Sequence, residues 1–145
     1  NAGIPSGLSL GLVAAGTPSS TAYDTIVSTN ASSYTLSLSQ NNDLKSGANT
    51  IPAISSTIAA PAAWTGGTIG LGFSVTSSTA TPIDGKWGGG ANYAAFPGTS
   101  TSIYTRTNGP APRDVITMNA KLAISSSQVA GDYSNTIAII GATVP

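Results

Sequence analysis

The chain has 145 residues and a formal net charge of zero, with five Lys+Arg, five acidic residues, no His and no Cys. This length suits one domain with its own core, and an apolar fraction of 40% at zero net charge argues against disorder. The scattered basic residues exclude the basic patch of a nucleic-acid-binding protein. No apolar run reaches the roughly 20 residues of a membrane-spanning helix, and the usual zinc ligands are missing.

Alternating apolar and polar residues predict strands that each bury one face. In chain order these are residues 8–12, 22–29, 34–38, 69–75, 102–107, 116–124 and 133–140. Gly, Pro and Asn fall between them, as turns require, and no window of a dozen residues carries a helical stripe. The chain is therefore predicted to be all-β, a single antiparallel β-sandwich over residues 1–145 with about seven strands.

Two long stretches are predicted to be irregular loops. Residues 42–64 are rich in Ala, Ser and Pro and are expected to cross from one sheet to the other. Residues 79–101 contain a Gly-rich run and the aromatic residues Trp87, Tyr93 and Phe96. Loops this long are uncommon unless they bind or assemble something. The three rings could plug an open end of the sandwich, contact a neighbouring subunit or stack on a glycan.

The chain lacks the residues of common catalytic sites. Without His, Cys or Glu, the usual general bases are missing, and no Ser-x-x-Lys arrangement occurs. We therefore predict no enzyme, no catalytic residue and no cofactor, and interpret the five Asp as turn and solubility residues. Asn41-Asn42-Asp43 offers oxygen ligands, but one carboxylate is too few for a calcium site, so no metal is predicted.

One structural feature is predicted at Tyr133, and an isopeptide crosslink is considered but not predicted, because three residues of common type do not make a motif. Tyr133 follows Gly131-Asp132 and is expected to hydrogen-bond back to an adjacent loop, as in the tyrosine corner of sandwich folds. Lys121 and Asn135, with Asp24 or Asp114 as the acid, are the residue types of an isopeptide crosslink.

Three stretches in order resemble secreted bacterial surface modules: Val27–Leu38, residues 51–73 and Val129–Ile137. The first is similar to an STNxxxGYTL motif and the last to xAGxYxNTI in Ig-like or WxL-like β-sandwiches. Ser33 replaces the usual Gly, and the Trp of the WxL signature is not matched, so peptidoglycan binding is not implied. The resemblance implies an Ig-like or jelly-roll-like sandwich in an extracellular, cell-attached or fibre-forming protein. A more distant architectural similarity is to donor-strand pilins and camelysin-like matrix fibres.

We therefore expect a structural subunit of an extracellular surface filament, a pilus or matrix fibre, that forms a homo-polymer by strand complementation. Residues 1–13 are the candidate exchanged strand, with Leu8, Leu10, Leu12 and Val13 as the groove-filling side chains. Burying three leucines would contribute about 5–8 kcal/mol before ordering costs. Residues 136–140 are the second choice of donor.

Two other functions remain open. The loop between Gly85 and Phe96 could serve a cell-surface adhesin or glycan-binding module, and a capsid or decoration protein would share the fold and the low charge. No signal peptide begins at Asn1, so the chain is expected to be either cytoplasmic or already processed. The filament interpretation places it at the cell surface.

Overall fold

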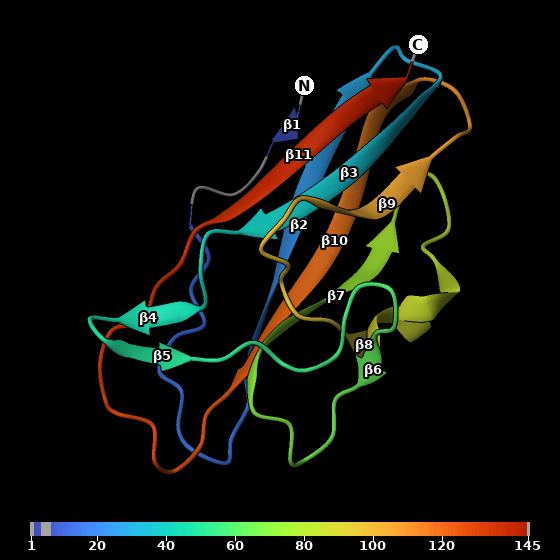
Figure 1. Cartoon of the computed structure of the whole chain (residues 1–145). Helices are drawn as coiled ribbons and strands as arrows, with labels where there is room; N and C mark the ends of the chain where they lie inside the picture. The colour runs from blue at the N-terminus through green and yellow to red at the C-terminus, as the bar shows by residue number, and fades with distance from the viewer. Residues whose placement is uncertain (1, 4–6, 145) are drawn as a thin grey trace.

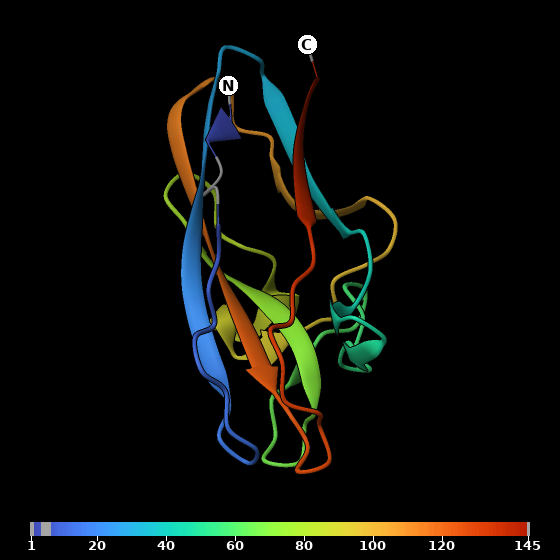
Figure 2. The ribbon, with the colours of Figure 1, turned by 90° about the vertical axis from the view of Figure 1, so that its left-hand side faces the viewer.

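The computed structural model describes residues 2–3 and 7–144 and is built from antiparallel sheets, which confirms the predicted all-β class. Two sheets form the layers of Figures 1 and 2. The first has the order β1-β2-β10-β7. Its strands are β1 (Ala2–Gly3), β2 (Ser19–Thr29), β10 (Ala111–Ala123) and β7 (Gly70–Ser78). The second is β11 (Ile137–Val144), β3 (Ser33–Gln40) and β9 (Thr101–Arg106), in that order.

Short elements occupy the two stretches that the sequence predicts to be irregular. β4 (Leu44–Ser46) pairs with β5 (Asn49–Ile51), and β6 (Ala62–Ala63) pairs with β8 (Asn92–Tyr93). A 3₁₀ turn, η1, spans Gly85–Gly90. Nowhere in the described part of the chain is a helix long and apolar enough to cross a membrane.

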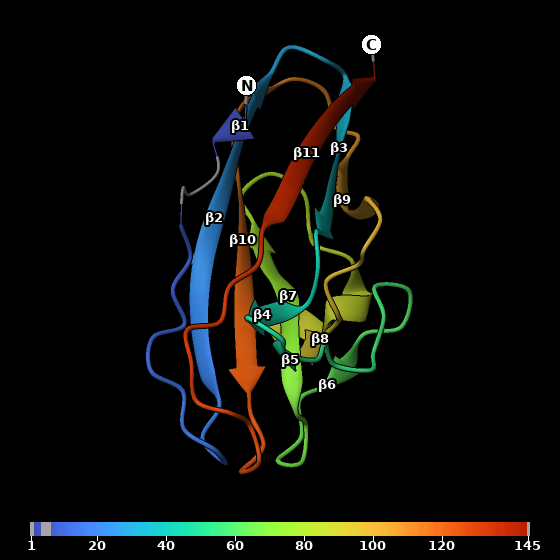
Figure 3. The same ribbon diagram turned by 60° about the vertical axis from the view of Figure 1, so that its left-hand side comes forward.

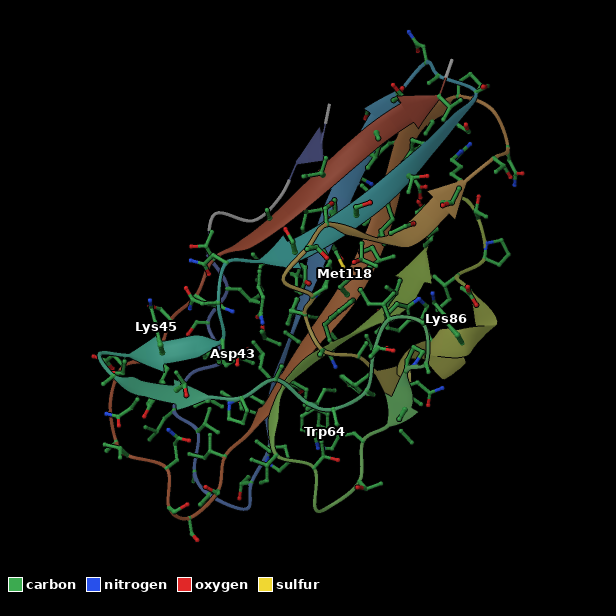
Figure 4. The ribbon with its side chains drawn as sticks, in the orientation of Figure 1. Asp43, Lys45, Trp64, Lys86 and Met118 are labelled. Carbon is green, nitrogen blue, oxygen red and sulfur yellow. The ribbon has the colours of Figure 1, made fainter. Side chains whose placement is uncertain are left out.

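The core lies between the two sheets, where the predicted alternation is confirmed. Tyr34, Leu36 and Leu38 of β3 are buried, whereas the residues between them are only half-buried. On β10 every second residue from Ile116 to Leu122 is buried, and Met118, labelled in Figure 4, sits at the centre of this row. Period-two burial on facing strands produces the apolar layer that holds a sandwich together.

The segment between β3 and β7 connects the two sheets, as predicted. It lies so close to β7 that glycine is required there. Backbone bonds join Leu71 N to Pro52 O and Ile54 N to Leu71 O, at 3.0 and 3.1 Å. A Cβ on Gly70 would lie 2.6 Å from the Pro52 carbonyl oxygen and 2.9 Å from the Ala53 carbonyl carbon, and Gly70 has a φ of +122°. Glycine at this position allows the connection to pack directly on the strand.

Two predicted strand positions are wrong. No strand forms at residues 8–12, because Gly11 adopts the left-handed conformation (φ +67°), which breaks an extended run. The last strand begins at Ile137 rather than at Tyr133. The residues before it are held by other contacts, among them backbone bonds of 3.1 and 3.0 Å between Lys45 and Ser134.

Candidate functional site

The sandwich has a cavity on the side where β2 of the first sheet faces β11 of the second. Figure 3 shows these two strands and the N-terminal segment beside β2. This flank cavity has a volume of about 840 Å³. Core side chains line it, among them Tyr23, Leu44, Phe96 and Leu122. Residues 7–13 form one wall and residues 124–137 the other. The cavity is open to solvent on one side, and its volume falls in the size range of binding sites.

The wall formed by residues 7–13 is apolar but loosely attached. Leu10 and Val13 pack against the core, whereas Leu12 is 101% exposed and Leu8 is 39% exposed. Among the described residues, none forms a backbone–backbone hydrogen bond with this segment. The Ser19 hydroxyl donates to the Leu10 carbonyl at 2.5 Å. Of the four predicted donor side chains, two are therefore packed in their own subunit and two are exposed.

The opposite wall is firmly bonded. The Tyr133 hydroxyl donates to the Val129 carbonyl at 2.6 Å, which confirms the predicted return bond. Gln128 Nε2 donates to the Tyr133 hydroxyl at 2.7 Å and to the Thr50 carbonyl at 3.2 Å. The contrast between the two walls indicates that residues 7–13 are the part that can leave the cavity at lower cost.

Tyr23 places an unpaired hydroxyl group in the lining of the flank cavity. The side chain is 8% exposed, and its hydroxyl has no hydrogen-bond partner among the described residues. Burial raises the pKa of Tyr23, so the hydroxyl stays protonated and is a donor at neutral pH. An unpaired buried donor is costly, and an occupant that offers a carbonyl oxygen would satisfy it.

β11 leaves both an edge and part of a face uncovered. It pairs with β3, and no described residue pairs with its other edge. Gly141 and Thr143 lie opposite the buried Leu36 and Tyr34, so they face inward, yet both are exposed. On the outer face Ile140 is 51% exposed and Val144 55%.

The three aromatic residues of the second loop are buried. Trp87 is 0%, Tyr93 6% and Phe96 3% exposed. The Phe73 ring centroid lies 5.3 Å from that of Trp87 and 4.7 Å from that of Phe96. This is the packing expected of a plug, and these rings present no open stacking surface. Contact between this loop and a glycan stays a prediction.

Trp64, which the sequence did not single out, belongs to a cluster on the outer side of the first sheet. Its ring meets Tyr93 edge-on at 5.3 Å, and Lys121 Nζ lies 5.1 Å from the Trp64 ring (Figure 4). Asn135 instead donates to Gln40 Oε1 and to the Asn42 carbonyl, at 3.1 and 3.2 Å. The structure therefore does not bring Lys121 and Asn135 together as a crosslinking pair.

Side-chain oxygens of the turn at residues 41–43 accept hydrogen bonds from other residues of the chain. Asn41 Oδ1 accepts from the Thr136 amide at 2.9 Å, and Asp43 Oδ1 accepts from Gln40 Nε2 at 3.0 Å (Figure 4). These bonds tie the end of β3 to the segment before β11.

Asp114 corrects the interpretation of the acidic residues as turn and solubility groups, because it is fully buried between the sheets. Its carboxylate accepts hydrogen bonds from four hydroxyls, and Arg106 Nη1 lies 3.9 Å away. The donors are Tyr34, Tyr104 at 3.0 Å, Ser78 at 3.1 Å and Thr79 at 3.1 Å.

Burial raises the pKa of Asp114, but the hydroxyl donors outweigh it and leave the pKa below its usual value. For Tyr34, burial and the bond to Asp114 both raise the pKa. The sequence contains a signal for this site, because Asp114 lies two residues before Ile116 and therefore on the same buried face of the strand.

Comparison with known proteins finds no matching family model, no similar curated protein and no similar solved structure.

Proposed function

We propose that the chain is a structural subunit of an extracellular surface filament, a pilus or matrix fibre, whose copies join by exchanging residues 7–13. Of the predicted exchanged strand, residues 1–13, Ala2 and Gly3 pair with β2 in the same subunit, and residues 1 and 4–6 lie outside the described residues. One observation carries the proposal: one wall of a large cavity that reaches the apolar core is an apolar segment that forms no strand and leaves Leu12 fully exposed. Such a segment would form more contacts in the groove of a neighbouring subunit than it forms in its own subunit. The resemblance to secreted surface modules supports the cell-surface location.

The energetics favour exchange over a permanent intramolecular wall. Full burial of a leucine contributes about 1.5–3 kcal/mol, and in the monomer Leu8 and Leu12 gain little of it. Strand addition would also supply a hydrogen-bonded ladder that residues 7–13 now lack. Ordering the segment costs conformational entropy, so the net gain per subunit is smaller than the burial term. Repeated at every junction, this gain stabilises a filament.

Leu12→Asp tests the proposal without disturbing the fold, since the Leu12 side chain touches solvent on all sides. The unchanged chain should form filaments in negative-stain electron microscopy, and Leu12→Asp should sediment as a monomer in analytical ultracentrifugation. Ile69→Asp is the matched control, because Ile69 is also an exposed apolar residue (41%) but lies outside the flank cavity. Filaments of Leu12→Asp as abundant as those of the control would refute the proposal.

A further inference from the structure

We infer that β11 is the acceptor strand: its free edge and the inner face of its last four residues receive residues 7–13 of a second copy. This inference rests on the proposed function, which names the donor but not the surface that takes it. Two edges border the flank cavity, β2 and β11, and the structure distinguishes them.

The backbone of β11 offers the longer open edge. Its eight residues extend about 26 Å, and a seven-residue donor would extend about 23 Å. No described residue pairs with that edge. The β2 edge is already engaged near one end, where β1 pairs with Ile26 and Val27, so its open run, residues 19–25, is shorter than β11.

The side chains of β11 also leave room for a donor. Inward-facing Tyr23 and Val27 of β2 are buried, whereas inward-facing Gly141 and Thr143 of β11 are exposed. A Cβ placed on Gly141 would only reach ordinary contact with Leu36 Cδ2, at 3.6 Å. Small residues with unfilled space above them suit large incoming side chains. Donor leucines beside Gly141 and Thr143 would therefore cover this face, and those beside Ile137 and Ile139, which line the flank cavity, would project into it.

The chemistry of the acceptor fits a peptide that is apolar and has free carbonyls. β11 contains no charged residue, and edge strands that avoid pairing usually carry one. The unpaired Tyr23 hydroxyl in the cavity lining is a donor that a backbone carbonyl of the incoming strand could satisfy. A second copy supplies both features in its residues 7–13, which are uncharged and mostly apolar.

Charge placed on the inner face of β11 tests the assignment. Thr143→Asp should abolish filaments, because its carboxylate would face the incoming leucines. Ala142→Asp is the control: it adds the same charge to the same strand at an exposed position on the outer face, and it should form filaments. Filaments of Thr143→Asp at the level of the unchanged chain would overturn the inference. Loss of filaments in both variants would overturn the choice of the inner face.

Mixing two variants tests the donor assignment and the acceptor assignment together in one experiment. Leu12→Asp and Thr143→Asp should each be monomeric alone, and an equimolar mixture should form dimers and nothing larger, since each mixed pair has one working donor and one working acceptor. A mixture that stays monomeric would overturn the inference.

A peptide of residues 7–13 gives a readout that does not depend on filaments. Added to the full-length Leu12→Asp chain, it should slow amide hydrogen exchange in β11 at least tenfold. Protection in β2 alone, or none in either strand, would overturn the acceptor assignment. Failure of the unchanged chain to form filaments would instead refute the proposed function, so the two failures are distinguishable.

Discussion

Asp114 shows how one buried carboxylate can fix the alignment of two sheets. Its ligands come from β3, β7, β9 and the residue after β7, so the four hydroxyls and the carboxylate cross the core. Burying a charge is costly unless it is fully hydrogen-bonded, and here several donors meet that need. A register shift of one residue in any of these strands would break the network.

The lowered pKa of Asp114 predicts a pH-dependent stability. The folded state binds this proton less tightly than the unfolded state, so the contribution is present above the unfolded value of about 3.9 and is lost as pH falls through the folded pKa. Chemical denaturation of the unchanged chain should therefore show a falling free energy of unfolding below about pH 4. In Asp114→Asn this fall should be smaller, with a loss of roughly 2–4 kcal/mol at pH 7. If the free energy of unfolding fell equally below about pH 4 in both chains, this role of Asp114 would be contradicted.

Trp87 supplies a second test at the residue scale. Because its side chain is fully buried against Phe73, Trp87→Ala should lower the free energy of unfolding by about 3–5 kcal/mol in urea denaturation. Leu12→Asp, which changes an exposed side chain, should stay within about 0.5 kcal/mol and is the comparison. A Trp87→Ala chain as stable as the unchanged one would show that the ring is not a core plug.

Among the elements, the proposed exchange requires the segment before β2 to change its conformation. Gly11 holds it in a turn with φ +67°, supported by a 3.2 Å bond from the Gly11 amide to the Ser9 hydroxyl. An extended donor strand requires Gly11 to leave the left-handed region. Glycine makes this change at low cost, which suits a segment that leaves one partner for another.

Gly11→Val should accelerate assembly. A β-branched residue disfavours the left-handed conformation by roughly 1–2 kcal/mol and favours the extended one, while no atom lies within 4 Å of the added Cβ. Light scattering should show filaments growing several-fold faster than for Gly7→Val, the control, since Gly7 has no positive φ and equally open space. Slower filament growth of Gly11→Val would contradict the proposed change of this segment from the left-handed to the extended conformation.

Strands with a partner on each side were the easiest to predict from the sequence. The alternating runs of β3 and β10 have a ladder on each side and a core to bury them, so period two is enough. β7 lies at the edge of its sheet, but its open side is covered by bridges to Ala53 and Ala94. The leucine run at residues 8–12 has the same period but no ladder, and pattern alone cannot show a missing partner. The interpretation of Asp114 as a turn or solubility residue rests on its residue type and overlooks its place on the buried face of the strand. The position of Trp64 against Lys121 depends on how the connection folds over the sheet, which no local pattern encodes.

At the scale of the whole molecule, low charge distinguishes the chain. Only 7% of its residues are charged and the net charge is zero, so copies repel one another little. The proposed contacts are apolar side chains and backbone hydrogen bonds, neither of which is screened by salt. Filament growth followed by light scattering should change by less than about twofold between 50 and 500 mM NaCl. A steep salt dependence would indicate that ion pairs, rather than the exchanged segment, join the subunits.

Negative-stain electron microscopy of the unchanged chain, beside Leu12→Asp, at neutral pH and without denaturant, tests strand exchange directly. Exchange of residues 7–13 predicts filaments of uniform width for the unchanged chain and discrete small particles for the variant. Closed shells or discrete particles from the unchanged chain would contradict it, as would filaments from both.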